Sequence, residues 1–130
     1  MRPVIAVAGF LLSLQAFACG YCVEDKIAAT YDHALITHAL AAGRHVVFFH
    51  VDGAPVRRAA LEQAASGRGI EKGSARISPD ALTLALVFDP RLVSLVELNA
   101  QLDRKLAKHK ASLLPLRLME RPADLAAVKR

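Results

Sequence analysis

Two cysteines form the pair of side chains whose type and spacing could do chemistry. They occur in the tetrapeptide Cys19-Gly20-Tyr21-Cys22, and the chain has no other cysteine. If the pair opens a helix, exposed backbone N–H groups and the helix dipole favour the thiolate, which is the nucleophile and the metal ligand. Lys26, one turn beyond Cys22, adds a positive charge. We therefore predict a reactive thiol site at Cys19 and Cys22.

Three functions are compatible with this pair. Two thiolates suit a nearly linear, two-coordinate soft ion such as Cu(I), which predicts a metal-binding protein with Cys19 and Cys22 as ligands. The tetrapeptide also resembles the active site of thioredoxin-like disulfide isomerases, which implies a redox-active disulfide between the same residues, although no strand precedes it here. The third function is a non-catalytic interaction module with a structural disulfide. A disulfide ring closed over two residues removes little chain entropy, so a structural disulfide would stabilise the fold only slightly and a reactive role is the better explanation of the pair. Of the two reactive roles, metal binding is the leading prediction.

Other candidate ligands and catalytic groups do not join the cysteines. Zinc would require about four ligands. His33 lies about three helical turns from Cys22, and His38 falls on an apolar helix face where we predict a core histidine. No ligand spacing is found for His45, His50 or His109. The sequence also lacks a serine–histidine–acid grouping, a phosphate-binding glycine loop and a carboxylate pair, so we predict no catalytic residues and do not favour an enzyme.

The N-terminal segment predicts export. Met1-Arg2 supplies a positive start, Val4–Leu14 is nearly all apolar, and Ala16-Phe17-Ala18 is a cleavage signature, so residues 1–18 are predicted to be a signal peptide. The apolar run is shorter than the roughly 20 residues of a spanning helix, so no membrane span is expected after cleavage. Lipidation of Cys19 is the alternative, but Phe17 fits its processing signal poorly. We expect a periplasmic or secreted protein in an oxidising compartment.

Charge and composition limit the classes of partner and of fold that we expect. The net charge is +5, and much of the excess lies in a basic run that we predict to be a solvated helix face: Arg104, Lys105, Lys108 and Lys110. An exported chain rarely meets nucleic acid, so a metal-transfer or redox partner protein is expected instead, and a homodimer stays open. Hydrophobic residues make up 54% of the chain but aromatic residues only 5%, which favours helices packed on a sheet in one domain.

Residues 19–43 are predicted to form the cysteine-bearing helix. The segment Val23–Ala42 contains no proline or glycine, and Gly43 is its predicted C-terminal stop. One helical face carries Ile27, Tyr31, Ala34, Leu35, His38 and Ala42. A second apolar strip carries Ala29, Ile36 and Leu40, which indicates contact with more than one neighbour.

Residues 44–120 are predicted to form an α+β domain, and residues 121–130 a C-terminal tail. The expected elements are a strand at Arg44–Val51, a helix at Pro55–Ser66, strands at Gly73–Ser78 and Leu82–Phe88, a helix from Asp89 to Lys110 and a strand at Leu114–Leu118. The first and third strands are apolar on both faces, so they should be central, whereas Pro115 places the last strand at an edge. This pattern predicts a ferredoxin-like βαββαβ sandwich, of sheet order 4-1-3-2, with an additional N-terminal helix.

One face of such a sheet needs an additional cover. The two helices of a ferredoxin-like sandwich cover one face only. We assign Val47, Phe49 and Val87 to the other face, which the N-terminal helix or a partner subunit could cover. The long helix is expected to bury Leu92, Leu95, Val96, Asn99, Leu102 and Leu106, and the last strand to place Leu114, Leu116 and Leu118 on one face.

The segment from about Val46 to Met119 resembles the heavy-metal-associated domain family. The cues are Val51-Asp52-Gly53 before the first helix, Gly69-Ile70 after it, and Phe88-Asp89-Pro90 after the third strand. The resemblance implies a ferredoxin-like module that carries copper or a related soft metal. That family has a C-x-x-C after the first strand, but Val56 and Ala59 occupy the matching positions. The cysteine pair of this chain therefore precedes the domain instead.

Overall fold

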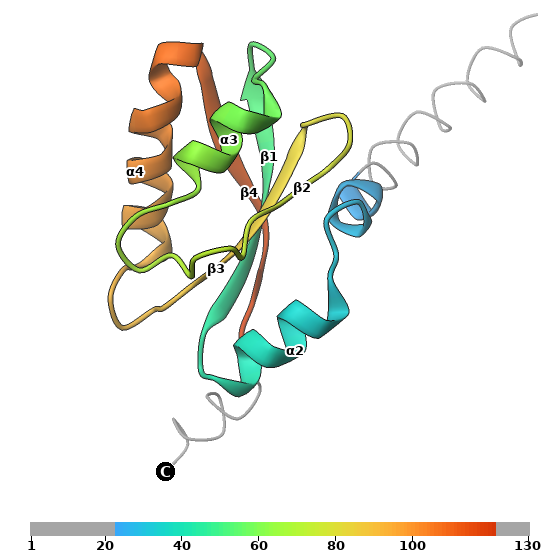
Figure 1. Ribbon diagram of the computed structural model, residues 1–130, viewed down its shortest axis with the longest axis vertical. Coiled ribbons are helices and arrows are strands. Elements are labelled where there is room, and N and C mark those ends of the chain that lie inside the picture. The colour runs from blue at the N-terminus through green and yellow to red at the C-terminus, as the bar shows by residue number, and fades with distance from the viewer. Residues whose placement is uncertain (1–22, 122–130) are drawn as a thin grey trace, which may run out of the picture.

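The computed structural model describes residues 23–121, in which four strands form one antiparallel sheet (Figure 1). A short helix at residues 23–28 is followed by α2 (His33–Ala41), β1 (His45–Gly53), α3 (Arg58–Ala64), β2 (Arg76–Ile77), β3 (Thr83–Phe88), α4 (Leu95–Leu106), the 3-10 turn η2 (Ala107–His109) and β4 (Ala111–Met119). The strand order is β2-β3-β1-β4, so β1 and β3 are the inner strands. The α+β class is confirmed.

Helices cover both faces of the sheet. Helices α3 and α4 lie on one side, called here the first face, and α2 lies on the opposite side together with the helix at residues 23–28 (Figure 1). The first-face core contains Leu61 of α3 and Leu98, Leu102 and Leu106 of α4. The second-face core contains Ile27, Ile36 and Ala39 from the N-terminal helices. The N-terminal segment therefore supplies the second cover that this sheet requires.

Strand register decides which side chains share a face. Val47 pairs with Leu86 and Phe49 with Leu84, so these four side chains enter the first-face core. Val46 pairs with Val87 and Phe48 with Ala85, and these four enter the second-face core. The expectation that Val47 and Phe49 lie on the second face is wrong, whereas that for Val87 is correct. Alternation groups residues within one strand, but only the pairing relates two strands.

The predicted helix over Val23–Ala42 is two helices instead of one. Helix 23–28 ends in a turn, and α2 starts after Asp32, whose carboxylate accepts the Leu35 N–H at 3.1 Å as an N-cap. The break rotates the apolar stripe. Ile36 and Ala39 are buried while His38 is exposed, so the predicted core position of His38 is wrong.

Gly43 ends α2 as predicted. Its φ is +79°, its N–H donates to Leu40 O at 3.1 Å, and the Arg44 N–H donates to Ala39 O at 2.9 Å. These two bonds form a Schellman motif, which uses the left-handed backbone that glycine adopts readily. The chain then turns directly into β1.

Helix α4 starts later than Asp89 because Ser94 is its N-cap. The Ser94 side chain accepts the Glu97 N–H at 3.2 Å, and residues 90–92 form a turn before it. The buried positions become Val93, Leu98, Leu102 and Leu106. Leu92 and Val96, which were expected to be buried, are 50% and 81% exposed.

Strand β4 changes face at a bulge beside Pro115. Phe48 pairs with Arg117 and Phe49 with Pro115, so one residue of β4 is extra. Leu118 consequently packs on the first-face core, Leu116 packs on the second, and Leu114 is exposed. The prediction that Leu114, Leu116 and Leu118 share one face is wrong, because a bulge interrupts the alternation.

Candidate functional site

Cys19 and Cys22 lie outside the described residues, so the structure bears on their site through the helix that follows them. Val23 comes directly after Cys22 and packs against the second-face core. Ile27, one turn later, is 5% exposed in the same core. The chain therefore leaves the tetrapeptide and enters a helix that is bound to the sheet.

One charge-assisted contact ties this helix to the sheet. Glu24 accepts a charge-assisted hydrogen bond from Arg117 of β4 at 2.9 Å. The charge of Lys26 acts on Asp80 in the turn between β2 and β3. The Ser78 hydroxyl is the largest cause that lowers the pKa of Asp80, the Leu82 N–H comes next, and Lys26 makes a smaller contribution.

A second anchor fixes the start of α2. Asp32 caps α2 and also accepts from Arg76 Nε of β2 at 3.0 Å. The Leu35 N–H lowers the pKa of Asp32 most, and the Arg76 hydrogen bond follows. Both groups favour the carboxylate form, so this contact between α2 and the edge strand is ionic at neutral pH.

The loop after β1 carries no metal-ligating side chain at the two positions that match the family's cysteines. Val56 is 6% exposed within the first-face core, and Ala59 is on the exposed side of α3. An apolar side chain at Val56 contributes to packing, because burying it removes apolar surface from water. The loop supports the fold here and offers no thiolate.

The five histidines lie on three elements: His33 and His38 on α2, His45 and His50 on β1, and His109 in η2. His33 stacks on Tyr31 at a ring-centroid distance of 6.4 Å, and His45 meets the ring of Phe88 edge-on at 5.6 Å. No group of three or more histidine, cysteine or carboxylate side chains among residues 23–121 is arranged to hold a metal ion. One histidine is unusual. Nδ1 of His50 is buried and has no hydrogen-bond partner in this part of the chain.

Sequence spacing missed His50 because the side chain lies on a strand. His50 follows Val46 and Phe48 at intervals of two residues and therefore belongs to the second face. Ligand spacing along the chain identifies sites built from one segment only. The signal that could have drawn attention to His50 is a polar residue continuing an apolar strand face.

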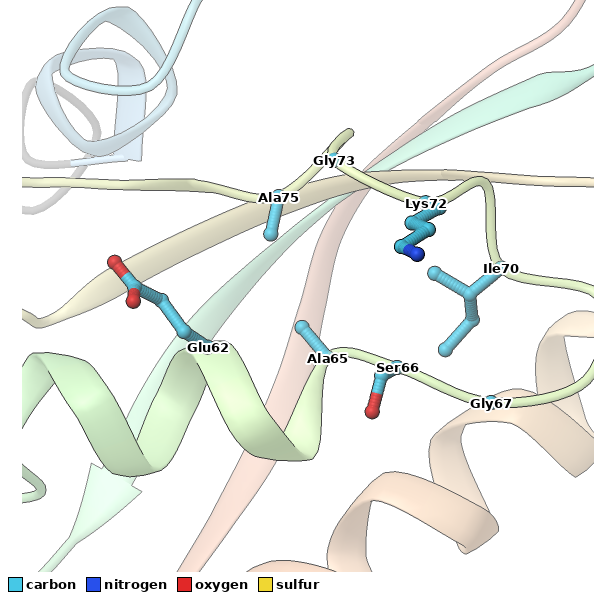
Figure 2. Close-up of a pocket in the computed structure, with 8 residues that line it drawn as sticks. All are labelled: Glu62, Ala65, Ser66, Gly67, Ile70, Lys72, Gly73 and Ala75. Carbon is cyan, nitrogen blue, oxygen red and sulfur yellow. The ribbon is translucent and has the colours of Figure 1, made fainter.

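A cavity of about 570 Å³ lies between the end of α3 and the segment that leads to β2 (Figure 2). Ala65, Ile70 and Ala75 give it apolar walls, while Glu62 and Lys72 lie at its margin. Glu62 is 4.0 Å from Arg58, a distance that indicates a weak surface pair. The cavity could hold a small apolar group. Its lining includes Ser66, whose hydroxyl donates to Gln63 O at 2.7 Å and is thus bound to the α3 backbone instead of to a general base.

The basic run lies partly in a cleft between α3 and α4. Arg104, Lys108 and Lys110 are exposed, as predicted for a solvated face. Lys105 differs, because its ammonium group donates to the carbonyls of Ala64 and Ser66 at the end of α3. Such a cation satisfies carbonyls that a helix end leaves unpaired.

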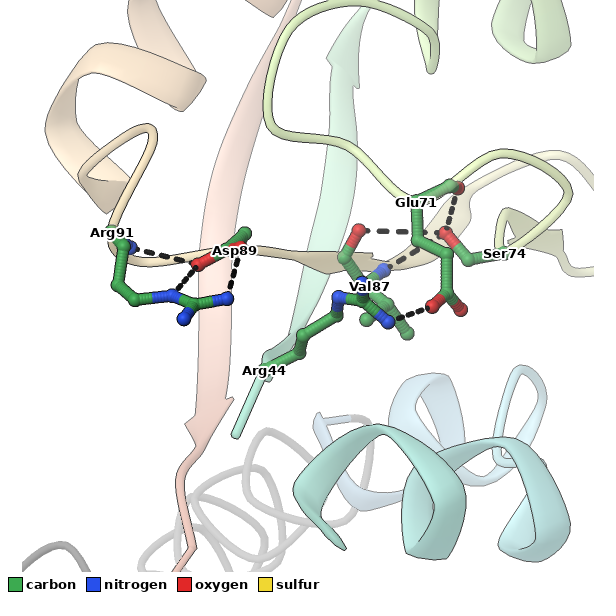
Figure 3. Close-up of polar contacts among 6 residues, drawn as sticks. All are labelled: Arg44, Glu71, Ser74, Val87, Asp89 and Arg91. Atoms are coloured by element: carbon green, nitrogen blue, oxygen red, sulfur yellow. Dashed lines mark hydrogen bonds and ion pairs between the residues drawn. The ribbon is translucent and has the colours of Figure 1, made fainter. Parts of the chain in front are cut away.

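Side chains replace strand pairing between residues 71 and 74. The Ser74 hydroxyl donates to Glu71 O at 2.7 Å and accepts the Val87 N–H at 3.1 Å, while the Glu71 side chain accepts from Arg44 at 2.7 Å (Figure 3). This network explains why β2 has two residues instead of the predicted Gly73–Ser78. The Ser74 hydroxyl accepts the Val87 N–H while the Glu71 N–H donates to Val87 O at 2.9 Å, so Val87 is paired at the edge of β3 without a regular strand ladder.

The turn that follows β3 depends on an ionised Asp89. Its carboxylate accepts from Arg91 Nε at 3.1 Å, from the second guanidinium nitrogen at 2.9 Å and from the Arg91 N–H at 2.9 Å (Figure 3). The hydrogen bond from the Arg91 side chain is the largest cause that lowers the pKa of Asp89 from 3.8 to about 2. The carboxylate form is therefore bound more strongly in the folded state.

Stability should consequently fall in acid because of Asp89. Its folded pKa of about 2 lies below the unfolded value of 3.8, so its contribution is present above pH 3.8 and is lost as the pH falls toward 2. We expect the denaturation midpoint of the Asp89→Asn variant to fall less steeply over that range. Urea denaturation at a series of pH values measures this, and parallel curves for both proteins would contradict it.

Comparison with protein-family models, with curated protein sequences and with solved structures found no match. Within residues 23–121, no helix combines the length and the apolar character needed to cross a lipid bilayer.

Proposed function

We propose that this chain is a small exported protein that binds a soft metal ion, with Cys19 and Cys22 as ligands and Cu(I) as the preferred ion. In this proposal, a ferredoxin-like module with an additional N-terminal cover presents the thiols to a metal-transfer partner. Thiolates select Cu(I) over harder ions. The pair also needs few additional ligands, because Cu(I) accepts low coordination numbers.

The observation that carries the proposal is the attachment of the helix at residues 23–28, which directly follows Cys22, to the sheet. Val23 and Ile27 pack on the second-face core, and Glu24 is bound to Arg117 at 2.9 Å. A pair joined directly to an anchored helix has less conformational freedom to lose on binding a metal than a pair on a free tail. Anchoring therefore favours a preorganised ligand pair.

The first-strand loop gives additional support. Val56 contributes to the first-face core at the position where the heavy-metal-associated family has a ligand. A chain that keeps the module but fills this loop with a packed side chain needs its thiols elsewhere. The tetrapeptide directly before Val23 meets that need.

The direct test is a Cu(I) titration against a competing chelator. The protein is expressed with its full N-terminal sequence, recovered from the export compartment, reduced, and its N-terminus determined by mass spectrometry. We expect one Cu(I) per chain for the wild type and loss of this site in the Cys19→Ser/Cys22→Ser variant. Equal uptake by the two proteins would reject the cysteine site.

The redox alternative is separated by a measurement on the same samples. Equilibration in glutathione buffers gives the reduction potential of the Cys19–Cys22 couple. A potential below about −300 mV indicates a structural bridge, because stable disulfides of exported proteins lie in that range. Tight cysteine-dependent Cu(I) binding supports the metal site, whereas catalysis of disulfide exchange without such binding supports the redox protein.

A further inference from the structure

The cavity between the end of α3 and the segment that leads to β2 has the size of a small-molecule site. Its volume is about 570 Å³, and such sites measure about 300–1,000 Å³. Ala65 belongs to the first-face core, and Ile70 and Ala75 are partly buried against that core. The three side chains face the same space (Figure 2). An apolar group in the cavity would therefore extend the first-face core and be removed from water there.

Hydrogen bonds on both sides hold the walls of this cavity in place. The Glu71 N–H donates to Val87 O at 2.9 Å, which ties one wall to β3. The same wall is tied to the turn after β3, because the Asp89 N–H donates to Gly69 O at 2.7 Å. On the side of α3, the Lys105 ammonium group donates to carbonyls at the end of the helix. The walls therefore resist collapse, and a preformed space is typical of ligand sites.

Lys72 gives the cavity a charge that the fold does not use. Its side chain points toward Ile70 and into the space between the walls, whereas Glu62 points the opposite way (Figure 2). Glu62 already has a cation, Arg58, at 4.0 Å. Lys72 forms no hydrogen bond or ion pair with another residue among 23–121. A free cation beside apolar walls is complementary to a ligand that combines a negative group with an apolar body.

We propose that this cavity binds a small amphipathic carboxylate, whose apolar body lies between Ala65, Ile70 and Ala75 and whose carboxylate pairs with Lys72. Apolar burial supplies most of the affinity, since an ion pair at an exposed ammonium group contributes little and chiefly selects the sign of the ligand's charge. The cysteine pair takes no part in this site, so the inference is independent of the proposed metal binding.

The experiment titrates the exported, processed protein with octanoate and follows methyl groups by NMR. The reporters are the methyls of Ala65, Ile70 and Ala75, and the reference is Ile36, which is buried in the second-face core. We expect saturable shifts of the three cavity methyls and none for Ile36. Affinity should rise from butanoate to octanoate by up to about fourfold for each added CH₂ group, because each group is removed from water.

Matched compounds and variants test the charge. Octylamine and 1-octanol carry the same chain without the negative group, and acetate carries the carboxylate without the chain, so all three should bind more weakly than octanoate. Lys72→Met keeps the apolar stem and should weaken octanoate binding about two- to fivefold, the range of an exposed ion pair. Lys108→Met removes the same charge from an exposed position on η2 and should leave the affinity unchanged.

Two kinds of result would overturn the proposal. Cavity methyls that stay unshifted, or that shift together with Ile36 without saturating, would show that octanoate does not occupy the cavity. Equal affinities for octanoate and octylamine, or for the wild type and Lys72→Met, would show that the site does not select an anion. Neither result affects the metal proposal, because Cu(I) uptake by Cys19 and Cys22 is measured separately.

Discussion

Replacing Phe48 by alanine should lower the free energy of unfolding by about 3–5 kcal/mol, which is the usual cost of removing a fully buried aromatic ring. Phe48 has no exposed surface, and it lies on the second face between β1 and the N-terminal helices. Ile27 and Ile36 pack in the same core. The Phe48 ring is buried only because these helices pack over it. The decrease in the free energy of unfolding therefore reports how tightly the helices pack on the second face.

Urea denaturation of the full chain measures this loss against two controls. Phe49→Ala removes a ring of the same kind, fully buried, from the first face, and should cost a similar amount. Val96→Ala changes a side chain that is 81% exposed and should stay within about 0.5 kcal/mol of the wild type. A cost for Phe48→Ala as small as that for Val96→Ala would mean that the second face is open in solution.

The second-face core connects stability with the proposed metal site. The helix at residues 23–28 covers Phe48 and also leads directly from Cys22 into the domain. The same packing that covers an apolar sheet face therefore fixes Val23, the residue that directly follows Cys22.

The inner position of β1 and β3 was predictable from the sequence. Both strands are apolar at nearly every position, which indicates burial on two faces. The edge position of β4 was predictable from Pro115, which cannot donate to a ladder. Its outer edge is also occupied by α4, because Asp103 accepts the Leu113 N–H at 2.8 Å and Asn99 donates to Leu113 O at 3.2 Å. These side chains protect an edge that could otherwise pair with another chain.

The relation between strands was not predictable in the same way. Alternation groups Val47 with Phe49, but it does not say whether they share a face with Val87 or with Leu86. The pairing of Val47 with Leu86 decides this, and pairing depends on the whole hairpin and crossover geometry. The bulge beside Pro115 also moves the following β4 side chains to the other face of the sheet, which a simple alternation of every second residue does not predict.

The predicted starts of two helices were wrong because a short polar side chain caps each helix at a later residue. Asp32 accepts the Leu35 N–H and Ser94 accepts the Glu97 N–H, so each starts a helix that the apolar pattern had begun earlier. Aspartate and serine are common N-caps, so this signal was present in the sequence. Helices that begin after the N-caps Asp32 and Ser94 exclude Tyr31 and Leu92 from the buried helix face, which agrees with their exposure.

The candidate site divides between the two kinds of inference. Cys19 and Cys22 came from residue type and spacing, which act within one short segment. The buried His50 Nδ1 atom without a partner among residues 23–121 came from three-dimensional packing, which spacing along the chain does not reveal.

Gly53→Ala should be strongly destabilising, by about 2–6 kcal/mol, because an alanine there faces two separate costs. The φ of Gly53 is +98°, and holding another residue in such a region costs about 1–3 kcal/mol. A Cβ on Gly53 would also lie 2.6 Å from the backbone oxygen of Lys110 and 3.2 Å from the Cα of Ala111. Backbone atoms cannot rotate away, so β1 and the start of β4 must separate, and overpacking adds about 1–3 kcal/mol.

Gly43→Ala is the matched control for this prediction. Gly43 has a similar φ of +79°, but a Cβ there would meet nothing within 4 Å, so only the backbone cost remains. Thermal or urea denaturation of both variants should therefore place Gly53→Ala well below Gly43→Ala, and equal losses would show that the close approach to Lys110 is relaxed in solution. Gly53 belongs to the Val51-Asp52-Gly53 cue that resembles a metal-binding loop. Its contact with the Lys110 backbone gives this glycine a packing role, so the cue can be present in a loop without metal ligands.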